Sequence, residues 1–218
     1  MSLQGTSTLI TSLAGGREQA LAEQGGYYTA ITPTPGTGII HGVVNTLVET
    51  TPVLVVYNGG LLNVFPTYLR MHCTVISTTA SAAHNWTNTI DTGNRYTSGG
   101  TALTINNNNM ASAATSGVIA TYGAVTASAA TGARRVLSHG QSKFVTVETV
   151  HDTVTLNWGN SDSSYLPPLI NNAASLTHVT INHGPCMIGP GQSMVLIHWS
   201  ASTTVAPTFE AEFGFIAK

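Results

Sequence analysis

Charged side chains are nearly missing from this chain: Asp, Glu, Lys and Arg together make up 7% of its 218 residues, against about a quarter in an ordinary soluble domain. Thr, Ser, Asn, Gly and Ala take their place, in short runs between alternating apolar stretches. An amphipathic surface helix carries charged or polar residues along its solvent-facing side, so this composition disfavours a helical fold. It favours many short strands that are joined by neutral polar turns.

Apolar residues make up 42% of the chain, which is enough for a packed core. In several segments apolar and polar residues alternate, as they do in a strand with one buried face. Four residues of segment 69–75 are expected to face the core: Leu69, Met71, Cys73 and Val75. Strand patterns also occur at 38–48, 52–57, 144–150, 154–158, 179–181, 194–199 and 209–215. Such short strands with Gly, Asn and Pro turns between them predict an all-β sandwich or barrel.

The first 35 residues differ from the rest of the chain. Residues 17–24 are the only stretch made of good helix formers, and Gly25-Gly26 follows as a helix stop. Segment 32–36 (TPTPG) then breaks regular structure. We therefore divide the chain into an N-terminal arm with a short helix at 1–35 and a β-sandwich at 36–218. The arm is expected to reach onto a neighbouring subunit, and the alternative is a frayed terminus.

The middle of the chain, at about 77–132, is dominated by Thr, Ser, Ala, Asn and Gly. Taken alone, this composition is typical of disorder. However, residues 102–105 and 118–125 could form short strands, and three aromatic residues could anchor them: Trp86, Tyr96 and Tyr122. We expect a long, ordered excursion on the surface of the sandwich.

Charge and hydropathy exclude two classes of partner. The net charge is −2 with seven basic residues, so the chain lacks the basic patch that nucleic-acid binding requires. No apolar run approaches the roughly 20 residues of a membrane span. The start of the chain has neither the positive region nor the apolar core of a secretory signal. Two cysteines, Cys73 and Cys186, make no disulfide framework and are expected to be buried thiols.

The histidines are the largest pool of groups for chemistry. His178, His183 and Cys186 have a spacing that suggests metal ligands, but a zinc site needs three or four converging ligands and no second pair follows. Convergence with His72 or Cys73 from another strand is the alternative. No Gly-x-Ser-x-Gly motif is present, and acidic residues are too few to select a glycosidase pair from. We therefore expect no enzyme activity, no cofactor and no metal.

The last part of the chain resembles a known class of proteins. A Pro-Gly turn at 188–193 leads into an alternating strand at 194–199, a Ser/Thr loop at 202–204 and a final strand after Pro207. This order is similar to the closing hairpin of jelly-roll virion proteins, such as decoration (cement) and accessory capsid proteins of tailed bacteriophages. The resemblance implies a jelly-roll-like antiparallel sandwich of eight strands, a symmetric oligomer, often a trimer, and a place on the particle exterior.

Two functions follow as expectations. The first is a virion structural protein, a capsid decoration, stabilising or accessory subunit that contacts its own copies as a homotrimer and other capsid proteins, and that assembles in the host cytoplasm. The second is a receptor- or carbohydrate-binding module of a fibre or adhesin, which would use Trp86, Tyr96 and Tyr122 as aromatic platforms. Arg17 and Glu18 on the arm helix are further candidates for contacts. A β-sandwich enzyme is the weakest alternative.

Overall fold

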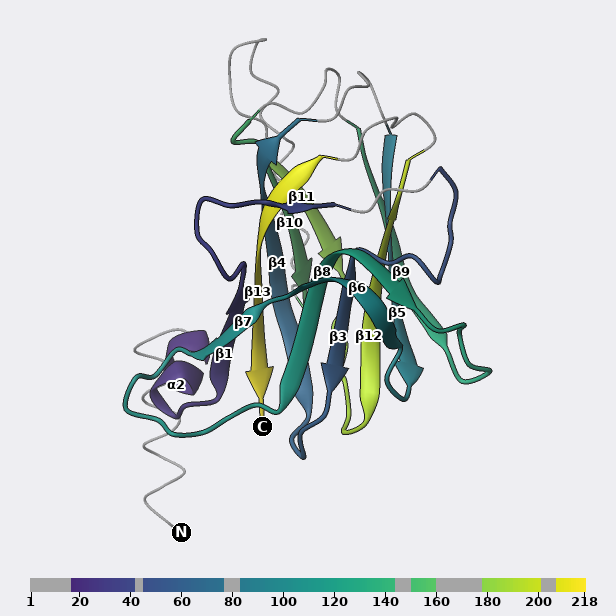
Figure 1. Ribbon diagram of the computed structural model, residues 1–218. Coiled ribbons are helices and arrows are strands. Elements are labelled where there is room, and N and C mark those ends of the chain that lie inside the picture. The colour runs from purple at the N-terminus through teal and green to yellow at the C-terminus, as the bar shows by residue number, and fades with distance from the viewer. Residues whose placement is uncertain (1–16, 42–44, 77–82, 144–149, 160–177, 201–206) are drawn as a thin grey trace.

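The computed structural model describes residues 17–41, 45–76, 83–143, 150–159, 178–200 and 207–218. These residues form one short helix and thirteen strands, and the strands make two sheets that pack face to face (Figure 1). The all-β sandwich predicted from the alternating segments and the scarcity of charge is confirmed.

The two sheets are named A and B. The helix α2 (Arg17–Glu23) precedes them. Sheet A has the strand order β11-β10-β4-β13-β1-β7, with β2 also on β13. Its strands are β1 (Tyr27–Ile31), β2 (Ile39–Ile40), β4 (Val64–Val75), β7 (Thr104–Asn107), β10 (Thr153–Trp158), β11 (His178–His183) and β13 (Thr208–Ala217). Sheet B has the order β6-β8-β3-β12-β5-β9. Its strands are β3 (Leu54–Asn58), β5 (Ala83–Thr92), β6 (Tyr96–Ala102), β8 (Val118–Ala127), β9 (Arg135–Lys143) and β12 (Gln192–Trp199).

Eight of the strands pair in a nested arrangement. β1 pairs antiparallel with β13, β3 with β12, β4 with β10, and β5 with β9. The pairs lie in sheets A, B, A and B in turn. This is the connectivity of a jelly roll, in which one long antiparallel ribbon is wound into two sheets. β11 departs from the pattern because it runs parallel to β10, and sheet A is therefore mixed.

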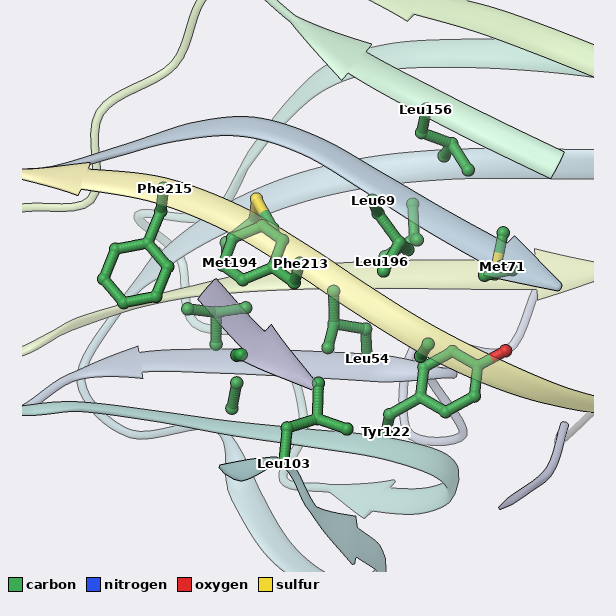
Figure 2. Packing of buried hydrophobic residues seen from close by; sticks show 14 of the residues in the cluster. Leu54, Leu69, Met71, Leu103, Tyr122, Leu156, Met194, Leu196, Phe213 and Phe215 are labelled. Atoms are coloured by element: carbon green, nitrogen blue, oxygen red, sulfur yellow. The ribbon is translucent and has the colours of Figure 1, made fainter. Parts of the chain in front are cut away.

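The core lies between the sheets and is filled by the inward-facing side chains of both (Figure 2). The alternation at 209–215 puts Phe209, Ala211, Phe213 and Phe215 on one face of β13, and all four are buried. Leu69, Met71 and Cys73 are buried as predicted, but Val75 is 54% exposed. The reason is a register shift, in which Phe209 pairs with Cys73 and Thr208 with Val75. The extra residue of β4 reverses the alternation at the end of the strand.

The expected arm at 1–35 contains part of the sandwich. The predicted helix is present, and Gly25 follows it with a φ of 71°. However, β1 lies between β13 and β7 in sheet A, and its Tyr28 and Ala30 are buried in the core. A boundary at residue 35 therefore falls after the first strand of the jelly roll.

The expected surface excursion at 77–132 is mostly sheet. β5 lies inside sheet B, between β12 and β9, so the prediction of an excursion is wrong for this strand. β6 and β8 extend sheet B beyond β3, and β7 joins the edge of sheet A. The strands predicted at 102–105 and 118–125 correspond to β7 and β8. The strand predicted at 38–48 is reduced to β2 among the described residues, and 144–149 lies outside them.

Candidate functional site

The aromatic residues predicted to bind a ligand do not share a surface. Trp86 and Tyr122 are 1% and 0% exposed and belong to the core between the sheets. The prediction that they form an exposed platform is therefore wrong, because β5 and β8 are strands whose side chains face inward at these positions. Tyr96 is 38% exposed and begins β6 at the edge of sheet B.

The two candidate contact residues of the helix lie elsewhere. α2 packs beside β1 of sheet A, whereas β6 with Tyr96 pairs with β8 in sheet B. The side chain of Glu18 is exposed, and the side chain of Arg17 lies outside the described part of the structure. The structure thus does not bring Arg17, Glu18 and Tyr96 to one strand edge, and their role in contacts stays a prediction.

Trp86 and Tyr122 surround a row of buried histidines that the sequence analysis did not single out. The Tyr122 hydroxyl is 2.6 Å from Nδ1 of His41, and Nε2 of His41 is 2.6 Å from Nδ1 of His198. Nε2 of His198 is in turn 2.8 Å from Nδ1 of His84. The ring of His198 stacks on Trp86, with 4.0 Å between the ring centroids. We call Tyr122, His41, His198 and His84 the histidine chain.

Burial favours the neutral forms of the central histidine and of the tyrosine in this chain. Burial, followed by the neighbouring His41 and His84, holds the pKa of His198 well below its ordinary value, and burial raises the pKa of Tyr122. A neutral imidazole has one donor and one acceptor nitrogen, so all N–H groups must point the same way along the chain. One added proton would place two donors face to face. The geometry therefore suits a fixed link between distant segments at neutral pH.

A second interior polar pair lies near the predicted metal ligands. Nδ1 of His183 is 2.5 Å from the Ser138 hydroxyl on β9, and the His183 ring stacks on Trp158. Burial and the nearby His139 lower the pKa of His183 to about 4. Among the described residues, Nε2 of His183 has no hydrogen-bond partner. Within the described residues this pair has no acid that would orient the base as in a hydrolase triad.

The predicted metal ligands are not gathered in the described part of the chain. Cys186 is a free thiol whose pKa is raised to about 12 by burial, and Cys73 lies buried in the core. His72 approaches His151 instead, with 3.2 Å between ring nitrogens. Within the described residues no three His, Cys, Asp or Glu side chains could hold one ion. The side chain of His178 lies outside them, so the expectation of no metal remains a prediction.

Two loops with exposed apolar side chains lie at the end of the sandwich where the chain terminates (Figure 1). Leu61 and Leu62, between β3 and β4, are 92% and 43% exposed, and Met187, just before the turn into β12, is 45% exposed. The side-chain amide of Asn58 donates to the carbonyls of both Leu62 and Ile188, which holds the two loops together. We call Leu61, Leu62 and Met187 the end patch. Exposed apolar side chains on two neighbouring loops are candidates for a contact surface.

The edge of sheet B is neutral as well as exposed. All seven residues of β6 (YTSGGTA) are exposed and none is charged. Its pairing with β8 is interrupted by register shifts, and Gly99 and Gly100 there have positive φ. Bulges of this kind twist an edge and limit its pairing with another strand. The end patch is therefore the better candidate for a contact between subunits.

Comparison with known proteins does not assign a family: the chain matches no protein-family model and no curated protein. In the part of the chain that the structure describes, no helix has both the length and the apolar character needed to cross a membrane. The strand connectivity and the surface are therefore the features that indicate a function.

Proposed function

We propose that this chain is a structural subunit of a virion, a capsid decoration, stabilising or accessory protein that acts through contacts between subunits. The observation that carries the proposal is the nested pairing of eight strands, because this connectivity is characteristic of jelly rolls, which include viral capsid domains. Lectin domains and cupins share it, so the fold alone does not decide between them.

The surface supports an assembly role. Side chains that carry no charge are removed from water at a lower cost than charged ones, and the core of a protein interface is depleted of charged residues. β6 is uncharged along its whole length, and the end patch offers apolar side chains on two loops. The proposed partners are copies of this chain, in a trimer, and other capsid proteins. Nucleic acid and membrane are not proposed as partners, and the proposed location is the virion.

Light scattering on the purified chain tests the oligomer. We expect a mass of three times 22.7 kDa. Leu61→Asp should convert the trimer to a monomer, because it places a charge in the end patch. Met110→Asp is the matched control, since Met110 is 99% exposed on the loop between β7 and β8, outside the patch. A monomeric wild-type protein, or a trimer that Leu61→Asp leaves intact, would contradict this interface.

A deletion that tests the N-terminal arm must end before α2, not at the boundary placed at residue 35. Removing residues 1–35 would also remove β1 from the middle of sheet A, and would unfold the protein whatever the arm does. Removing residues 1–16 leaves α2 and all thirteen strands in place. We expect this variant to keep its melting temperature and to form a weaker trimer. An unchanged trimer would exclude a role of these residues in assembly.

A further inference from the structure

A cavity of about 480 Å³ lies at the corner where α2 meets sheet A. Six of the residues that line it carry the inference: Glu18 from the helix, Phe65, Thr67 and Tyr68 from β4, and Asn157 and Trp158 from β10. Sites for small molecules usually measure about 300–1,000 Å³. The volume of this corner cavity is therefore sufficient for a ligand of one or a few rings.

The lining combines aromatic rings with neutral hydrogen-bonding groups. Phe65, Tyr68 and Trp158 supply the rings. The amide nitrogen of Asn157 donates to Asn182 at 3.3 Å, which leaves its amide oxygen as an acceptor. The indole N–H of Trp158 is buried and has no hydrogen-bond partner among the described residues. That nitrogen is closed off from solvent, so the cavity offers a ligand the oxygens of Glu18, Asn157 and Thr67 rather than this donor.

The charges around the cavity disfavour an anion. Glu18 lines the cavity, and Glu212 accepts hydrogen bonds from both Tyr68 and Arg70 on the same face of sheet A. Arg70 and Lys218 lie beside the lining rings, so two cations offset the two carboxylates and the surroundings of the cavity have no net positive charge to attract an anion.

A cation is disfavoured for a different reason. The ammonium group of Lys218 lies 5.2 Å from the centre of the Phe65 ring, and the guanidinium of Arg70 lies 5.9 Å from that of Tyr68. The protein's own cations thus already make the cation–π contacts that a cationic ligand would seek. A wholly apolar ligand would leave the amide of Asn157 and the hydroxyl of Thr67 buried beneath it without new partners.

We propose that the corner cavity binds a neutral saccharide. Sugar C–H groups would pack on the aromatic rings, and sugar hydroxyls would bond to Glu18 and Asn157. This site is separate from the aromatic platform expected at Trp86 and Tyr122. The inference goes beyond the proposed structural role and does not depend on it.

Saturation-transfer NMR with the full chain tests the proposal. The probes are methyl α-glucopyranoside, methyl β-galactopyranoside and N-acetylglucosamine, with choline and inorganic phosphate as charged probes. We expect at least one sugar to bind saturably and neither charged probe to bind. Binding of choline or phosphate in place of the sugars, or no binding of any of the three sugars, would overturn the proposal.

Matched variants locate the site. Glu18→Gln and Asn157→Ala should weaken sugar binding by about tenfold, the effect of losing one good hydrogen bond. Glu23→Gln is the control on the same helix, because Glu23 is exposed and does not line the cavity. If all three variants bound the sugar equally well, the assignment of the binding site to the corner cavity would be wrong. Light scattering on the same samples reports assembly separately, so loss of the trimer and loss of sugar binding are distinguishable outcomes.

Discussion

The interior holds two polar groups of opposite character. In the first, the guanidinium of Arg95 donates to the carboxylate of Asp91 at 2.9 Å, and both side chains are almost fully buried. The same carboxylate accepts from the backbone of Thr131 and Thr92. In the second, the histidine chain, three imidazole rings pair with one another, and they come from His41, His84 and His198, which are far apart in the sequence.

The difference shows two ways to bury a polar group. Burial opposes ionisation of Asp91, but hydrogen bonds from Thr131, Thr92 and Arg95 outweigh it and lower its pKa. The ion pair is local, because Asp91 and Arg95 are four residues apart at the turn between β5 and β6. A hydrogen bond from the backbone of Thr131 connects it to the segment that follows β8. The histidine chain is centred on His198, whose pKa is lowered by burial, and it links distant segments. The first group should therefore resist mild acid, and the second should not.

Arg95→Met tests the charged group and should have the largest effect. It leaves the carboxylate of Asp91 buried without its counter-ion, which costs about 3–5 kcal/mol of unfolding free energy. Arg70→Met is the control, because the Arg70–Glu212 pair has side chains that are 53% and 31% exposed. Breaking that pair should cost at most about 1 kcal/mol. Urea denaturation measures both, and similar losses would mean that burial does not decide the strength of the two pairs.

His198→Leu tests the neutral group. The change removes the central ring, so one nitrogen each of His41 and His84 loses its partner in His198, at 2.6 and 2.8 Å. Stranding a buried polar group costs about 1–3 kcal/mol, and we expect a loss of about 3 kcal/mol in all. His72→Leu, in the less buried His72–His151 pair, should cost under about 1 kcal/mol. If both variants were equally stable, the histidine chain would not be a structural link.

The pH dependence of stability separates the buried histidines His183 and His198 from Asp91. His183 and His198 have folded-state pKa values below the ordinary 6.5, so the unfolded chain binds more protons and stability falls as the pH drops below 6.5. For His183 the fall continues to about pH 4, and at 1.36 kcal/mol per pH unit it amounts to about 3 kcal/mol. Above pH 6.5 neither histidine should contribute.

Asp91 acts in a different pH range. Its pKa is lowered from 3.8, so the stability that it contributes is present above that pH and is lost as the pH falls further. Denaturant titrations at a series of pH values between 7 and 3 should therefore show that the free energy of unfolding falls first as the histidines titrate. His183→Gln should make this first decrease smaller. Stability that stays level from pH 7 to 4 would contradict the neutral state of the buried histidines.

The sequence predicted those parts of the fold in which one face of a strand is apolar. β4, β10, β12 and β13 all alternate or are continuously apolar, and burial of alternate side chains makes such a pattern visible. β5 (AHNWTNTIDT) was missed because Asn and Thr dominate it. Its neutral polar side chains are buried by pairing with β12 and β9, so tertiary context overrides composition.

The interior sites were harder to predict, because strand pairing creates them. His198 lies opposite Trp86, and Tyr122 opposite Leu54, only after β12, β5, β3 and β8 have aligned. One signal was available: His198 stands inside the apolar run of β12 (QSMVLIHW), where a histidine must be buried. No sequence pattern indicated the corner cavity, because α2, β4 and β10 are far apart in the sequence and meet only in the folded chain.

Thr131→Val should have the smallest effect. It tests how much one hydrogen bond to the Asp91 carboxylate contributes to the buried ion pair. The Thr131 hydroxyl donates to Asp91 and also accepts from the backbone of Ala133. Loss of a hydrogen bond to a charged group costs about 1.5–3 kcal/mol when the site is buried, and we expect the lower end because Thr131 is exposed. The pKa of Asp91 should also rise, so that its loss of stability begins at higher pH. Thr131→Ser keeps the hydroxyl and should restore both properties. If the valine variant had wild-type stability and lost stability over the same acidic pH range as the wild type, the backbone donors alone would keep Asp91 ionised.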